Sequence, residues 1–190
     1  MVLAAFLVVS TAMAQNTLLS AEAQATKQFD GKGLGTYQWA SVTYAKEKGL
    51  GIFGFLVHEP GYAGIALGPL LMFTPGDLYI ETSIGPGIDI APGRTNLSAN
   101  GYVYVESKSD QENQKGKFMI YTNPYYSKPY GFFQMTSMMY GISNALSLGL
   151  YSQTAAVTGI RTQYTIKSFN VSATVGPKAV MVGIGINLGL

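Results

Sequence analysis

The sequence predicts an all-β fold, an antiparallel up-and-down β-barrel that crosses a membrane with its strands. Apolar residues recur at every second position in many short stretches, and such alternation gives a β-strand one apolar and one polar face. Charged residues make up only 12% of the chain, against about 25% in ordinary soluble domains. A lipid-facing wall carries charge at a high energetic cost, which explains such a deficit. The 23 glycines and 13 tyrosines are typical of short strands, tight turns and interfacial aromatic residues.

The chain begins with a stretch typical of a secretory signal peptide. Residues 1–9 are apolar, and Ala12-Met13-Ala14 forms a small-x-small cleavage site. The stretch is too short to span a bilayer as a helix. We therefore expect residues 1–14 to be a signal peptide, with a buried N-terminal strand as the alternative. Removal of 14 of the 190 residues would leave 176, enough for one domain.

Composition argues against several classes of function. The chain has no cysteine, so it can form neither disulfides nor thiolate metal sites. Its net charge of +2 gives no argument for nucleic acid or an acidic substrate as a partner. His58 is the single histidine, and it stands beside Glu59 without a partner at motif spacing. We therefore expect no enzyme, no cofactor and no metal site.

Residues 15–35 predict either an N-terminal extension or the first strand. Between residues 16 and 29 small apolar residues alternate with polar ones, as a barrel strand requires. Ala, Glu, Gln and Lys are also helix formers, so a short helix or plug is the alternative. Residues 30–33 form a turn cluster.

From residue 36 strands and turns alternate to the end of the chain, which defines a barrel domain at 36–190. The first expected strands are 37–45, 50–58, 62–73 and 78–90. The last of these is regular over its whole length, with aliphatic residues at most even positions and with Glu81 and Asp89 on the odd face. An apolar face opposite a face with carboxylates is the lipid-and-lumen pattern of a transmembrane strand.

The second half of the chain continues the same alternation of strands and turns. The polar residues 107–117 predict a solvated loop, and the tyrosine-rich residues 124–130 predict a loop at the headgroup interface. Within 160–167, Arg161 and Lys167 share the polar face. The remaining expected strands lie at 96–106, 118–123, 132–140, 146–153, 160–167 and 169–190.

The last strand carries six large aliphatic residues on one face. They are Val180, Val182, Ile184, Ile186, Leu188 and Leu190. This pattern resembles the C-terminal strand of bacterial outer-membrane β-barrels, although those usually end in an aromatic residue. The texture of residues 36–190 is similar to the small-barrel class that includes the OmpA-type membrane domain and the opacity-type adhesins. The resemblance implies a Gram-negative outer membrane, contact with its lipid, and recognition of the last strand by the barrel-assembly machinery.

The expected number of strands depends on two segments. Counting from residue 36, with 169–190 as one bulged strand, gives about ten. We favour ten because the polar 107–117 loop would then lie outside, as bacterial barrels prefer. The apolar face switches from odd to even positions at Gly176-Pro177, so a bulge or a tight turn must lie there. Adding 16–29 and splitting the last strand gives twelve, and merging strands gives eight.

Two sets of residues are candidates for function. The charges expected to face the lumen are Glu81, Asp89, Arg161 and Lys167. In a narrow barrel such charges pair and fill the interior, which we favour, whereas in a wider barrel they line a water path. The tyrosines could form a carbohydrate-stacking surface, but interfacial girdles are favoured. The expected interfacial aromatics are Trp39, Tyr102, Tyr104, Tyr125, Tyr126 and Tyr130.

The resulting hypothesis is a porin-like outer-membrane β-barrel protein with a structural or adhesive role, or with narrow passage of small solutes. The alternative is a secreted soluble barrel of lipocalin-like kind that binds an apolar ligand. The two hypotheses place the alternating faces oppositely. A membrane barrel has its apolar face outside, whereas a soluble barrel needs its polar face outside. A lipid-modifying enzyme in the membrane would need catalytic residues that the sequence does not show.

Overall fold

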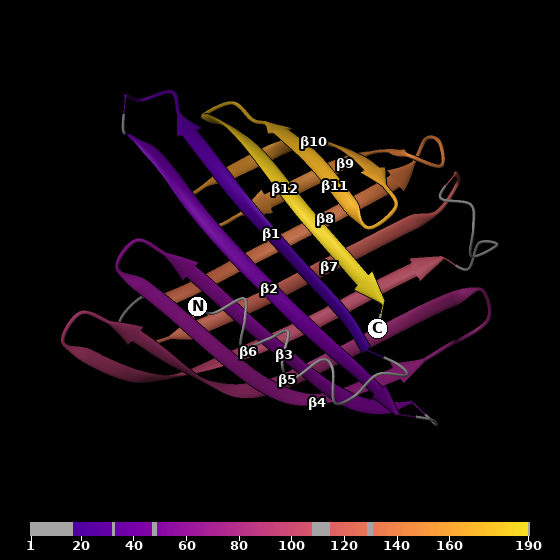
Figure 1. Ribbon diagram of the computed structural model, residues 1–190, viewed down its shortest axis with the longest axis horizontal. Coiled ribbons are helices and arrows are strands. Elements are labelled where there is room, and N and C mark those ends of the chain that lie inside the picture. Colours follow the sequence, from indigo (N-terminus) through magenta and orange to yellow (C-terminus); the bar gives the residue numbers. More distant parts are fainter. Residues whose placement is uncertain (1–16, 32, 47–48, 108–114, 129–130, 190) are drawn as a thin grey trace.

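The computed structural model describes residues 17–31, 33–46, 49–107, 115–128 and 131–189. The predicted signal peptide at 1–14 lies outside these residues. The described chain forms one closed antiparallel barrel in which each strand pairs with its chain neighbours and β1 pairs with β12 (Figure 1). The strands are β1 (Thr17–Gln28), β2 (Leu34–Lys46), β3 (Leu50–Glu59), β4 (Tyr62–Phe73), β5 (Leu78–Ala91), β6 (Arg94–Ser107), β7 (Phe118–Ser127), β8 (Gly131–Gly141), β9 (Leu146–Gln153), β10 (Val157–Ile166), β11 (Phe169–Val175) and β12 (Ala179–Gly189).

The predicted alternation sets which side of the wall each residue faces. On β5, Ile84 is 75% exposed while Glu81 and Asp89 are buried. On the neighbouring β6, Leu97 is 81% exposed. The apolar face of each strand therefore lies outside and the mixed face inside, which is the orientation of a membrane-spanning barrel and opposite to the one that a soluble barrel needs.

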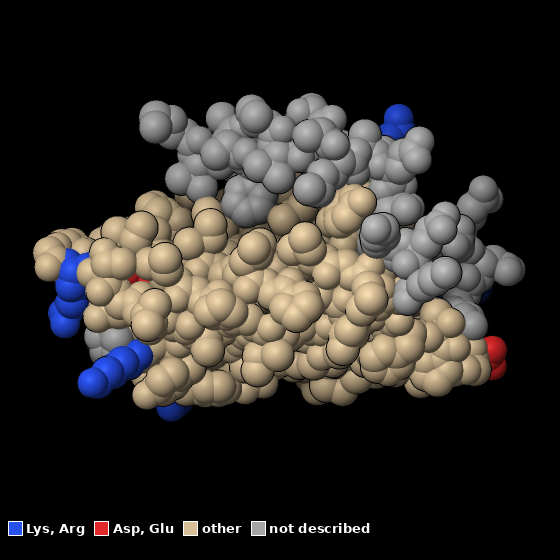
Figure 2. All heavy atoms as spheres, turned by 90° about the horizontal axis from the view of Figure 1, so that it is seen from below, with Lys and Arg blue, Asp and Glu red and all other residues tan. Residues whose placement is uncertain are grey.

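The outer wall is apolar over a broad band. Figure 2 shows one face of the molecule, on which the basic and acidic side chains lie toward the ends and the wall between them shows none. No helix in the described part of the chain is long and apolar enough to cross a membrane. Large apolar residues exposed on the outside include Ile65, Leu67, Leu71, Ile88, Leu150, Ile160, Val175, Val182 and Ile184.

The expectation of about ten strands is wrong, because the described residues form twelve. Residues 17–28 pair on both sides, with β2 and β12, so sheet hydrogen bonds outweigh the helix propensity of Ala, Glu and Lys. At Gly176 the chain makes a tight turn, in which its N–H donates to the Ala179 carbonyl at 3.0 Å. The predicted change of face at Gly176-Pro177 thus separates β11 from β12.

The twelve-strand count also moves the polar loop. We call the end of the barrel where β1 begins and β12 finishes the terminal end, and the opposite end the distal end. β6 ends and β7 begins at the terminal end, whereas the ten-strand count placed the 107–117 loop opposite; residues 108–114 of that predicted loop lie outside the described residues. The predicted aromatic loop at 124–130 is also corrected, because β7 continues through Ser127.

Candidate functional site

The interior of the barrel is filled by side chains. Phe53, Phe55 and Leu70 face inward and are fully or almost fully buried, and Met135 and Met181 are equally buried on the other side. These residues belong to two apolar clusters. The side chains of Trp39, Tyr121 and Phe133 pack against both clusters.

Aromatic rings from opposite walls stack across the interior. Trp39 of β2 stacks on Tyr121 of β7, with ring centroids 6.0 Å apart and planes at 22°. Tyr37 of β2 stacks on Phe133 of β8 at 5.6 Å and 26°. β2 and β8 are separated by five strands in either direction around the closed order. These two pairs, which we call the cross-lumen stacks, therefore join opposite walls and close the lumen between them.

One half of the interior holds carboxylates through tyrosine hydroxyls. Glu81 accepts hydrogen bonds from the hydroxyls of Tyr79 and Tyr102, each at 2.6 Å. Asp89, which is completely buried, accepts from Tyr62 at 3.0 Å and from Tyr125. The described contacts of these two carboxylates are thus with neutral donors rather than basic side chains.

The other half holds an ion pair. Arg161 of β10 donates to Glu22 of β1 at 2.6 Å, and the two side chains are only 3% and 7% exposed. Ser172 of β11 also donates to Glu22, at 2.9 Å, and the guanidinium lies 4.6 Å from the centre of the Tyr151 ring. Gly183 of β12 makes room for this network, because a Cβ there would lie 2.1 Å from the Glu22 carboxylate. The network links the first strand to the last three.

The structure places three of the four predicted lumen charges inside. Glu81, Asp89 and Arg161 are buried and face inward, although Arg161 pairs with Glu22 rather than with either of them. Lys167 does not face the lumen. β10 ends at Ile166, and Lys167 lies exposed in the following turn with φ of 54°. The turn interrupts the alternation from which its inward direction was predicted.

Most of the predicted interfacial aromatics are also corrected. Trp39, Tyr102, Tyr104 and Tyr125 lie on the inward positions of their strands, as the cross-lumen stacks and the tyrosine–carboxylate contacts show. Tyr102, Tyr104 and Glu106 all lie at even positions of β6, so they share one face of the strand. The polar residue on that face predicts an inward direction that the aromatic content alone does not. Tyr126 lies on the outer face and is 53% exposed, and Tyr130 lies outside the described residues.

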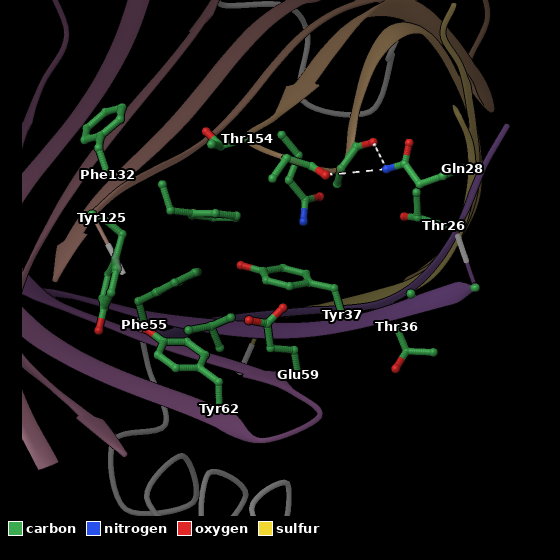
Figure 3. A pocket seen from close by; sticks show the side chains of 18 residues that line it. Thr26, Gln28, Thr36, Tyr37, Phe55, Glu59, Tyr62, Tyr125, Phe132 and Thr154 are labelled. Carbon is green, nitrogen blue, oxygen red and sulfur yellow. Dashed lines mark hydrogen bonds between the residues drawn. The ribbon is translucent and has the colours of Figure 1, made fainter. Parts of the chain in front are cut away.

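A pocket of about 410 Å³ opens at the distal end (Figure 3). The amide of Gln28 donates to the Ala156 carbonyl at 2.7 Å and so holds the β9–β10 turn at its edge. No single stretch of sequence predicts this pocket, because its aromatic residues come from two separate regions of the chain, β2 to β4 and β7 to β8. They are Tyr37, Phe55, Tyr62, Tyr125, Phe132 and Phe133.

The described residues show no further constellation typical of catalysis or metal binding. His58, the single histidine, lies exposed near the end of β3, paired across the sheet with Gln38 and Ala63. Within the described ranges no group of three or more His, Asp or Glu residues could hold a metal ion. The filled interior and the distal pocket are therefore the candidate site.

The chain matches no family model and no curated protein. Among solved structures it is similar to the KdgM porin, with a TM-score of 0.54 and 11% identity over 90% of this chain and 99% of that one. A structure of the KdgM porin in complex with disordered oligogalacturonate matches with a TM-score of 0.54 and 10% identity, over the same shares of the chains. The Acinetobacter baumannii outer membrane protein Omp33 gives 0.47 and 11%, over 94% and 99%.

At such low identity the two matches to the KdgM porin support the fold alone. The described chain has the closed antiparallel up-and-down barrel fold that the KdgM porin also has, and the predicted fold class is confirmed at that level. The predicted outer-membrane location agrees with this fold and with the apolar outer wall. The narrower resemblance to OmpA-type and opacity-type barrels receives no support from the matches.

Proposed function

We propose that the protein is an outer-membrane barrel for narrow passage of small solutes, and that the Trp39–Tyr121 pair of the cross-lumen stacks closes this passage at rest, deeper than the distal pocket that Tyr37 and Phe133 line. The observation that carries the proposal is that the closing residues keep polar atoms without partners. The Trp39 indole N–H and the Tyr121 hydroxyl are buried and have no hydrogen-bond partner. A permanent dry plug pairs nearly all such groups, whereas a layer that meets water or a polar solute need not.

The means of opening would be local, because the barrier consists of side chains. The strands that carry Trp39 and Tyr121 are each paired on both sides, so the wall is fixed. Side chains change rotamers much faster than sheets rearrange. A swing of the Trp39 and Tyr121 rings would connect the distal pocket with the interior below it.

The charge of the lining favours cations and neutral solutes over anions. Glu22 is balanced by Arg161, but Glu81 and Asp89 are held by neutral hydroxyls. Carboxylates along a path set its ion preference. One matched porin structure contains oligogalacturonate, which is anionic, and this lining gives no reason to transfer that ligand to this chain.

The test is conductance in planar bilayers. The unmodified protein is expected to give little conductance, and the Trp39→Ala/Tyr121→Ala double variant is expected to raise it several-fold with a preference for cations. Tyr126→Ala, which removes an aromatic ring from the outer face, is the matched control and should leave conductance unchanged. A double variant that still folds, judged by faster gel migration before boiling, but stays silent would contradict the proposal and favour a structural barrel.

The proposal includes two partners. Outer-membrane lipid would contact the apolar outer wall, and the barrel-assembly machinery would recognise β12, whose outer positions from Val180 to Leu188 are all aliphatic. Neither an adhesive nor a catalytic role is part of the proposal.

A further inference from the structure

The distal pocket is an aromatic enclosure of the size of a small-molecule site. Its volume of about 410 Å³ lies in the range of about 300–1,000 Å³ that such sites occupy. Tyr37 and Phe133 form one stacked pair in its lining, and Phe55 and Tyr62 come from the adjoining strands. Aromatic rings that line a cavity attract flat apolar groups and, where a ring face is accessible, cations through the negative charge of that face.

The charge of the lining distinguishes these two kinds of ligand. Among the described residues that line the pocket, Glu59 is the only acidic or basic side chain. In Figure 3 its carboxylate lies beside the rings of Tyr37 and Tyr62. Asp89, buried behind the Tyr62 and Tyr125 hydroxyls that contact it, adds negative potential from below. The exposed basic residues of the distal end do not line the pocket: Lys27, Arg94, Lys128 and Lys178.

The Tyr37 hydroxyl is a polar group in the pocket that has no hydrogen-bond partner. Tyr37 is only 7% exposed, and its hydroxyl has no hydrogen-bond partner. Figure 3 shows this hydroxyl directed into the cavity. A buried polar atom left without a partner is costly, and a ligand that supplies one relieves the cost.

We infer that the distal pocket binds a small organic cation with an alkylated ammonium group. Aromatic rings of the lining would contact the ammonium group, Glu59 would neutralise it, and the Tyr37 hydroxyl would bind a polar group on the remainder of the molecule. Aromatic cages are a known physical solution for such cations, because a fully alkylated ammonium group has no N–H to donate. The inference deepens the proposed function and rests on it in one respect, namely that this pocket is the entrance of the same lumen.

Calorimetric titration of the purified full chain in detergent tests the site directly. The probes are choline, its uncharged isostere 3,3-dimethyl-1-butanol, and glucose. Choline is expected to bind at least about tenfold more tightly than the isostere, the ratio that a cation–π contact and a nearby carboxylate support. Glu59→Gln should abolish most of that ratio, and Tyr37→Phe should weaken choline binding by a smaller factor. Glu106→Gln, which changes a carboxylate at the terminal end, is the matched control and should change neither.

Three outcomes would overturn the inference. Equal binding of choline and the isostere would mean a merely apolar pocket, tighter binding of glucose would mean a sugar site, and no binding at all would mean no site. Failure of the proposed function would look different. In that case choline still binds and responds to Glu59→Gln, while the Trp39→Ala/Tyr121→Ala variant remains silent in bilayers.

Discussion

The two halves of the barrel interior treat buried carboxylates in opposite ways. Around β1 and β10, Glu22 is paired with Arg161 at 2.6 Å and receives a further hydrogen bond from Ser172. Around β5, Glu81 and Asp89 have tyrosine hydroxyls as their described donors and no described ion pair. The first half thus holds an ion pair, whereas the described contacts of the carboxylates in the second half are with neutral hydroxyls.

This difference indicates that the half with the ion pair stabilises the barrel and that the half with Glu81 and Asp89 influences which solutes pass. A buried ion pair is costly to break because removal of one partner leaves an uncompensated charge, so the Glu22–Arg161 pair stabilises the contact between β1 and β10. A carboxylate that contacts only neutral donors has no neighbouring cation to offset its charge. When ionised, it adds negative potential to the lumen and to the distal pocket. We therefore expect substitutions in the first half to change stability and substitutions in the second half to change selectivity.

Arg161→Leu should give the largest effect. It leaves Glu22 buried without its cation, and the free energy of unfolding should fall by about 3–5 kcal/mol. Urea unfolding in lipid vesicles measures this fall in the free energy of unfolding. Loss of the fast-migrating band of the unboiled sample on a gel reports loss of the folded barrel. The Glu22→Leu/Arg161→Leu double variant should recover most of the loss, because it removes both charges. A single variant as stable as the unmodified chain would show that the pair does not hold the barrel closed.

Gly183→Ala should have an intermediate effect on the same network. The new Cβ would lie 2.1 Å from the Glu22 carboxylate and 2.7 Å from the Ser172 hydroxyl, so the network must shift. Overpacking of this kind costs about 1–3 kcal/mol, measured again by urea unfolding. Gly189→Ala on the same strand is the matched control, because nothing lies within 4 Å of its added Cβ. Equal stability of the two variants would contradict the close packing of Glu22 against β12.

The inward direction of Glu81 and Asp89 could be predicted from sequence because β5 alternates without interruption from Leu78 to Ala91. The frequency of tyrosine and tryptophan at membrane interfaces predicts an interfacial place for Trp39 and Tyr102, whereas the side of the strand on which each lies directs both inward. The first strand was ambiguous because its small and charged residues also form helices. Only pairing with β12 decides in favour of a strand, and that contact joins opposite ends of the chain.

The cross-lumen stacks and the distal pocket lay beyond sequence reasoning for a different reason. Strand alternation says that Tyr37 and Phe133 point inward, but not that they meet. Their contact depends on the strand count, which places β2 opposite β8, and on the register of every pair between them. An error of two strands, such as the expected ten, changes which walls face each other.

Glu81→Gln should give the smallest change in stability and the sharpest test of the comparison. The glutamine carbonyl can still accept one tyrosine hydroxyl, so we expect the free energy of unfolding to change by less than about 1 kcal/mol. Ion preference should respond instead, because the substitution removes a negative charge from the lining. In the conducting Trp39→Ala/Tyr121→Ala background, reversal potentials in a salt gradient should shift away from cation preference.

Glu22→Gln is the informative counterpart, since it leaves Arg161 without its anion and should lower stability before it changes ion preference. If Glu22→Gln and Glu81→Gln lowered stability equally and left the reversal potential unchanged, the division between a structural half and a functional half would be wrong.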